Sequence, residues 1–110
     1  MISENIHRRY LQDPLPVRLG GLAADLARIA SFAENPNNHE AVAHLFQEGK
    51  YFAEWAAPDA PIETQWQLAQ VQTWLSLWHR RWLAGATDAA MRVEAQSWSD
   101  RLLELSGLLS

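Results

Sequence analysis

The sequence contains no cysteine. This absence excludes disulfides, thiolate metal sites, cysteine nucleophiles and covalent thioether cofactors. The sequence also lacks any run of about 18 apolar residues, the length that a membrane-spanning helix requires. The start of the chain, MISENIHRRYLQDP, has no apolar stretch of the kind found in secretory signal peptides. We therefore expect a cytoplasmic protein that does not enter a membrane.

The sequence also contains few positively charged residues. Nine Lys and Arg face thirteen Asp and Glu, which gives a net charge of −4. This balance argues against nucleic acid as a partner. No glycine-rich phosphate loop, internal repeat or low-complexity tract occurs. The length of 110 residues and the hydrophobic fraction of 48% are typical of one compact globular domain.

Turn-forming residues divide the chain into four long segments. The breaks fall at Asp13-Pro14, at 35–38, at 58–61 and at 85–87. Each segment has the three- and four-residue apolar spacing of an amphipathic helix rather than the alternation of a strand. Segments of about 20 to 24 residues joined by short loops favour antiparallel neighbours. We therefore predict an all-α fold, an antiparallel up-and-down four-helix bundle that occupies residues 13–110 as one domain.

Residues 1–12 form an N-terminal leader to this bundle. We expect one short helix from Ser3, with Ile6 and Tyr10 in contact with the bundle. Asn37 or Asn38 would cap the second long helix, and Thr87 the fourth, because these side chains accept hydrogen bonds from the first free amides of a helix.

The stretch WLSLWHRRW, residues 74–82, has two interpretations. At about 100° per residue, the apolar positions from Leu68 to Trp82 lie within a sector of roughly 80°. This stripe predicts that Trp78 and Trp82 fill one end of the core. The alternative is a pocket for an anionic ligand, lined by Trp74, Trp78 and Trp82, with His79, Arg80 or Arg81 orienting the ligand.

A second apolar stripe lies on the opposite side of the same segment. It consists of Ile62, Trp66, Ala69, Thr73 and Leu77. One helix of a simple bundle needs a single apolar face, so a second face needs its own cover. We predict that a two-fold homodimer covers it, since such interfaces are self-complementary and use Trp and Leu readily. The alternative is that the N-terminal leader covers this second face by packing over Trp66.

The motif HEAVAH, from His39 to His44, resembles the H-E-x-x-H zinc motif but is one residue too long. Histidines five residues apart point about 140° from each other around a helix and cannot share a metal ion. Glu40, His44 and Glu48 remain as the least unlikely metal ligands. This spacing is more typical of a solvated face with helical ion pairs, so we assign no metal site.

Three stretches carry a resemblance: RRYLQDPLPVRLGGLAADLARIASF (8–32), FAEWAAPDAPI (52–62) and SWSDRLLELSGLL (97–109). In the overall pattern of residues along most of the chain, rather than in a single motif, they resemble small uncharacterised all-helical proteins of cyanobacteria. The resemblance implies a bacterial cytoplasmic protein. That family has no assigned activity, so it transfers no functional residue.

These observations favour a non-enzymatic helical module that works through protein–protein contact, including contact with itself. No catalytic residue and no cofactor is assigned, because no paired nucleophile and base can be identified from spacing. The alternative function is a small-molecule-binding bundle or a minor enzyme that uses the tryptophan-lined pocket described above.

Overall fold

The computed structural model describes residues 3–86 and 88–108, and these residues form five α-helices. The helices are α1 (Glu4–Gln12), α2 (Leu15–Phe32), α3 (His39–Ala56), α4 (Ile62–Leu83) and α5 (Ala89–Ser106). Two 3₁₀ turns, η1 (Pro36–Asn38) and η2 (Ala57–Asp59), complete the corners before and after α3.

Most helix boundaries follow from local chemistry. Ser3 caps α1 by accepting a hydrogen bond from the amide of Ile6, and Asp88 caps α5 in the same way. Helices α2 and α4 begin after Pro14 and Pro61, where the chain is extended. Gly85, at φ 86°, ends the turn after α4 in a left-handed conformation that residues with a side chain rarely adopt.

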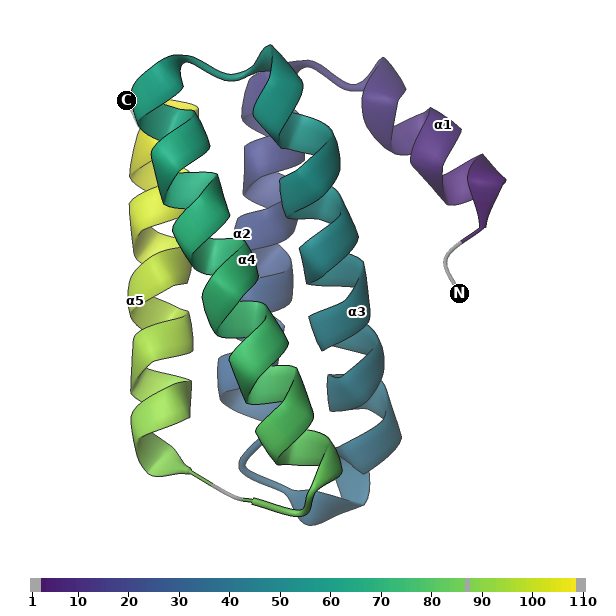
Figure 1. The fold of residues 1–110 in the computed structure, drawn as a ribbon, viewed down its shortest axis with the longest axis vertical. Coiled ribbons are helices and arrows are strands. Elements are labelled where there is room, and N and C mark those ends of the chain that lie inside the picture. Colours follow the sequence, from purple (N-terminus) through teal and green to yellow (C-terminus); the bar gives the residue numbers. More distant parts are fainter. Residues whose placement is uncertain (1–2, 87, 109–110) are drawn as a thin grey trace.

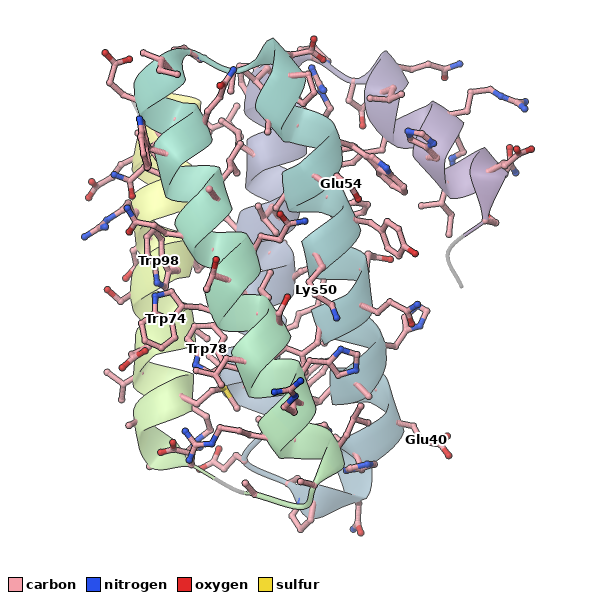
Figure 2. All side chains as sticks on the ribbon, in the orientation of Figure 1. Glu40, Lys50, Glu54, Trp74, Trp78 and Trp98 are labelled. Atoms are coloured by element: carbon pink, nitrogen blue, oxygen red, sulfur yellow. The ribbon has the colours of Figure 1, made fainter. Side chains whose placement is uncertain are left out.

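The four long helices lie side by side and reverse direction from one to the next (Figure 1). Helix α2 packs against both α5 and α3, and α3 also packs against α4. Helices α4 and α5 make few close backbone contacts, and large side chains such as Trp74, Trp78 and Trp98 lie between them (Figure 2). The core is therefore built on α2 and α3, with α4 and α5 added from two sides.

The core consists mainly of aliphatic side chains. Those that are almost fully buried include Leu22, Leu26, Ile29, Val42, Phe46, Leu68, Val71, Leu75 and Leu102. One polar side chain joins the first and last long helices, since the Ser99 hydroxyl donates to the carbonyl oxygen of Ala23 at 2.7 Å. Gly49 lets α4 approach α3, because a Cβ there would lie 3.2 Å from the Leu75 side chain.

Helix α1 leans away from the long helices and is anchored through Tyr10 (Figure 1). The Tyr10 hydroxyl lies 2.9 Å from the carbonyl oxygen of Arg18 and 3.2 Å from that of Phe52. Its ring stacks on Phe52 at 4.1 Å, and His7 stacks on Trp55 at 4.0 Å. Burial raises the pKa of Tyr10, which therefore stays a neutral hydrogen-bond donor.

The all-helical class is confirmed, with one more helix than four because residues 4–12 make a helix of their own. Helix α4 has 22 residues, as expected, whereas α2, α3 and α5 have 18 each and are shorter than the predicted 20 to 24. Asn38 occupies the N-cap position of α3 as predicted, but its side chain makes no cap hydrogen bond. The side chain that does cap in this corner is Asn35, which accepts from the amide of Asn37 at the start of η1. The predicted cap Thr87 lies outside the described residues.

Candidate functional site

The outer face of α4 carries several large apolar side chains that are exposed. Of its predicted stripe, Ile62 is 62% exposed, Trp66 67% and Leu77 42%. Ala69 and Thr73, between them, are exposed as well. Helix α1 docks on α3 instead, through Tyr10. The alternative in which the leader covers Trp66 is therefore wrong for this chain on its own.

A shallow groove of about 240 Å³ runs beside Trp66, lined also by Ile62, Gln65 and Ala69. A second groove of about 240 Å³ lies between α4 and α5, where Trp74 and Trp98 form part of its wall (Figure 2). Trp74 is 38% exposed, and the Arg101 guanidinium lies 4.8 Å above the Trp98 ring. The apolar surface thus extends from α4 toward α5.

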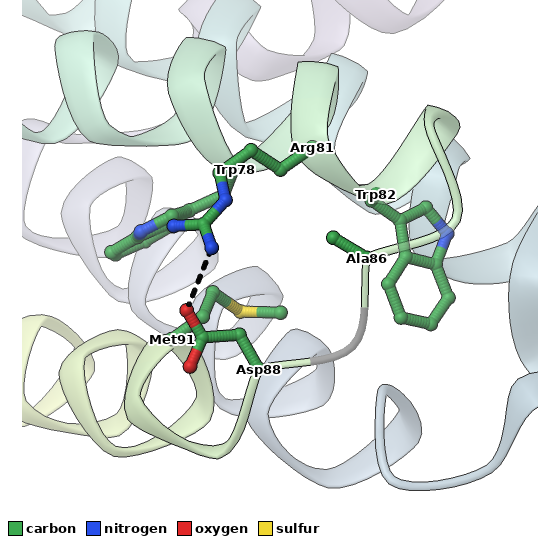
Figure 3. Close-up of a pocket in the computed structure, with 6 residues that line it drawn as sticks. All are labelled: Trp78, Arg81, Trp82, Ala86, Asp88 and Met91. Carbon is green, nitrogen blue, oxygen red and sulfur yellow. Dashed lines mark ion pairs between the residues drawn. The ribbon is translucent and has the colours of Figure 1, made fainter.

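Of the three tryptophans predicted to line one pocket, Trp78 and Trp82 line a small space together, whereas Trp74 lines the separate groove between α4 and α5. Trp78 and Trp82 are buried, as the core interpretation predicts, and the space beside them has a volume of about 10 Å³. One water molecule needs about that much. Figure 3 shows Arg81 reaching over the opening to pair with Asp88, with 3.3 Å between Nη2 and Oδ2. An anionic ligand does not fit there without movement of these side chains.

The basic residues near these tryptophans do not converge. Arg80 is exposed, Arg81 is paired with Asp88 toward α5, and His79 faces α3, where its ring stacks on Phe46 at 5.7 Å. His79, Arg80 and Arg81 therefore do not point into one common cleft.

His79 lies instead in a groove of about 320 Å³ between α3 and α4. Its Nδ1 atom is 2.9 Å from the Nζ atom of Lys50. Gln47, Tyr51, Glu54 and Gln72 complete the lining. Burial, and secondarily the positive charge of Lys50, lower the pKa of His79. The groove therefore combines one ammonium group with a neutral imidazole and several hydrogen-bonding side chains.

A carboxyl pair lies between α2 and α3, in which Asp25 is buried and Glu48 is half-buried. Asp25 is 1% exposed, and its Oδ2 atom has no ordinary donor among the described residues. Burial, a hydrogen bond to Glu48 and the charge of Glu48 raise the pKa of Asp25 to about 8, while Arg28 opposes the rise. One shared proton satisfies both observations, because a protonated carboxyl is a donor and a carboxylate is not.

The three residues considered as metal ligands, to which no metal site was assigned, do not form a cluster. Glu40 and His44 are exposed, whereas Glu48 interacts with Asp25. Within residues 3–86 and 88–108, no group of three His, Asp or Glu side chains is placed to hold a metal ion. In the same ranges, no helix is long and apolar enough to cross a membrane.

Comparisons with protein families, curated proteins and solved structures find no match for this chain. The resemblance to cyanobacterial helical proteins therefore stays a prediction, and the functional argument rests on the chain's own residues.

Sequence reasoning missed three features of these sites: Asp25, Lys50 and Gln72. Asp25 gave a signal, since its carboxylate follows an apolar run in a helix that is apolar on most sides. Lys50 gave another, because it is the only lysine in the chain. Neither signal identifies the residue that Asp25 or Lys50 contacts, because those contacts depend on how α3 is rotated against its neighbours.

Proposed function

We propose that this chain is a non-enzymatic helical interaction module that self-associates through the outer face of α4. The four long helices would act as one up-and-down bundle with α1 attached at its side. In a two-fold homodimer, Ile62, Trp66, Ala69, Thr73 and Leu77 of each copy would face the same residues of the other. The expectation of a cytoplasmic location stays a prediction.

The exposure of Trp66 carries the proposal. Isolated apolar side chains on a surface are ordinary, but several in line on one helix face are typical of interfaces. The groove beside Trp66, lined by Ile62 and Ala69, offers a receptor for an indole from a second copy. A protruding ring next to a groove on the same face is self-complementary, as a two-fold interface requires.

Burial of Trp66 in such a dimer would make a substantial contribution to the free energy of association. An indole buries about 150 to 250 Å² when fully covered. Two thirds of that surface is open at Trp66, and at about 25 cal/mol per Å² its burial would contribute about 3 kcal/mol per copy. A stable interface covers about 800 Å² on each partner, more than one helix stripe offers. The contact would therefore include the surface around Trp74 on the side of α5.

The test is the molar mass by light scattering after gel filtration, over a range of concentrations. We expect a mass near twice the monomer mass of 12.5 kDa. Trp66→Ala should weaken dimerisation at least about 100-fold, because 1.4 kcal/mol corresponds to a factor of ten. Trp66→Ala combined with Leu77→Ala should give a monomer at all practical concentrations.

A matched control is the double variant Leu11→Ala with Val17→Ala. Both side chains are 45% exposed, as apolar as those of the stripe, and lie on α1 and α2. This control should dimerise like the unchanged protein. A wild-type monomer at every concentration, or a dimer unaffected by the loss of Trp66 and Leu77, would refute self-association through this face.

A further inference from the structure

Lys50 stands apart from the other cationic side chains. It is the only lysine among the nine Lys and Arg residues, and it lies partly buried between α3 and α4 (Figure 2). Arg18, Arg28, Arg81 and Arg92 each pair with a carboxylate. In the described part of the chain, no carboxylate oxygen lies within 4.0 Å of the Lys50 ammonium. The other cations without such a partner, Arg8, Arg9, Arg80 and Arg101, are all exposed, whereas Lys50 is partly buried.

The partner that Lys50 does have is neutral. An ammonium can only donate, so the contact of 2.9 Å with Nδ1 of His79 makes that atom the acceptor. The His79 ring therefore carries its hydrogen on Nε2 and has no charge. One of the three ammonium N–H groups is used in this contact, and the positive charge is left without compensation beside a groove.

The same groove is held in place by the backbone around Lys50. Gln72 of α4 donates from Nε2 to the carbonyl oxygen of Lys50 at 3.2 Å. Gly49, next in the chain, allows the close approach of Leu75. These two contacts hold α4 against α3 at the level of Lys50.

We propose that the groove between Lys50 and His79 binds a small oxyanion, either a carboxylate or a phosphate group. The Lys50 ammonium supplies the charge and the His79 ring is a second donor beside it. The volume of about 320 Å³ suits a ligand of a few heavy atoms. This inference is independent of self-association, because the groove contains none of the residues of the α4 outer face.

The other lining residues can accommodate an anion. Tyr51, Gln47 and Gln72 can all donate hydrogen bonds. Glu54 is the one carboxylate in the lining; it is exposed to solvent and remains outside ion-pair distance of Lys50. A bound oxyanion also leaves its mark on His79. Lys50, Tyr51 and Glu54 line the groove with His79 from the side of α3. The negative charge of a bound oxyanion would offset the positive charge of Lys50, and the pKa of His79 would therefore rise.

The experiment uses the full chain labelled with ¹³C,¹⁵N-lysine and ¹³C-histidine. Because there is one lysine, its Cε signal reports on Lys50 alone. Sodium phosphate and sodium acetate are titrated separately at constant ionic strength, with chloride as the reference anion. We expect saturable shifts of both the Lys50 and the His79 signals, together with a higher His79 pKa. Saturation by phosphate only, or by acetate only, identifies which oxyanion the groove takes.

Two variants make the test independent of any one substitution. Lys50→Met, read at His79, and His79→Gln, read at Lys50, should each weaken binding about tenfold or more. Arg8→Gln removes one positive charge from the exposed side of α1 and should change the affinity less than twofold. Linear shifts with neither anion saturating, or equal losses in Arg8→Gln and Lys50→Met, would overturn the proposal.

Discussion

The carboxyl pair between α2 and α3 makes the stability of this protein depend on pH in a predictable direction. Asp25 has its pKa raised from 3.8 to about 8 by burial and by Glu48. In the unfolded chain it ionises near its ordinary value. Between these values the folded chain holds a proton that the unfolded chain releases. The stability linked to Asp25 is therefore fully present below about pH 4 and is lost as the pH rises through about 8.

Replacing Asp25 by Asn removes this dependence and keeps the shape of the side chain. One pH unit corresponds to about 1.4 kcal/mol for one proton taken up on folding. The stability difference between Asp25→Asn and the unchanged protein should therefore widen by about 1.4 kcal/mol per unit, or about 4 kcal/mol from pH 4 to pH 7. The asparagine amide can also donate to Glu48, as the shared proton does now.

The assay is urea unfolding of both proteins at pH 5, 6, 7 and 8, followed by circular dichroism. Glu48→Gln serves as a second variant, since it removes the other carboxyl group of the pair and should flatten the dependence in part. Parallel stability profiles for Asp25→Asn and the unchanged protein across this range would show that Asp25 is ionised in the folded state. The shared proton would then be refuted.

Three further substitutions test the packing. Tyr10→Phe should cost about 1 to 2 kcal/mol, because the carbonyl of Arg18 loses a buried donor, and hydrogen exchange should speed up selectively in α1. Gly21→Ala should stabilise the protein by about 0.5 to 1 kcal/mol, since the nearest atom to a new Cβ is 4.0 Å away and alanine favours helix. Gly49→Ala should destabilise it in the same urea assay, because the buried Leu75 cannot yield; equal effects at the two glycines would contradict this packing.

The parts of the fold that follow from local pattern could be predicted from the sequence. Apolar spacing predicted helices throughout, and the sector from Leu68 to Trp82 correctly placed Trp78 and Trp82 in the core. The proline and asparagine breaks marked the corners. Each of these signals acts within a few residues of the chain, where the helical period alone decides which side chains share a face.

The pairings between helices could not be predicted in this way. Arg18 is buried because α1 and η2 both meet α2 at its start, where Asp59 pairs with the guanidinium at 2.9 Å. Lys50 meets His79 only because α3 and α4 have one particular register. A helical pattern specifies which face of each helix is buried. It specifies neither how that helix is rotated relative to a neighbouring helix nor how far it is shifted along the neighbour's axis. These contacts therefore depend on packing that no short motif records.

The pairing of α2 with α5 has a consequence for how the protein is made. Helices α3 and α4 are neighbours in the chain and can pack as soon as both have been synthesised. The hydrogen bond from Ser99 to Ala23, in contrast, spans 76 residues. Synthesis proceeds at about 5 to 20 residues per second, so the apolar face of α2 waits several seconds for its final partner. During that interval the side of α2 that faces α5 in the folded protein lacks this partner, because α5 is synthesised after α3 and α4.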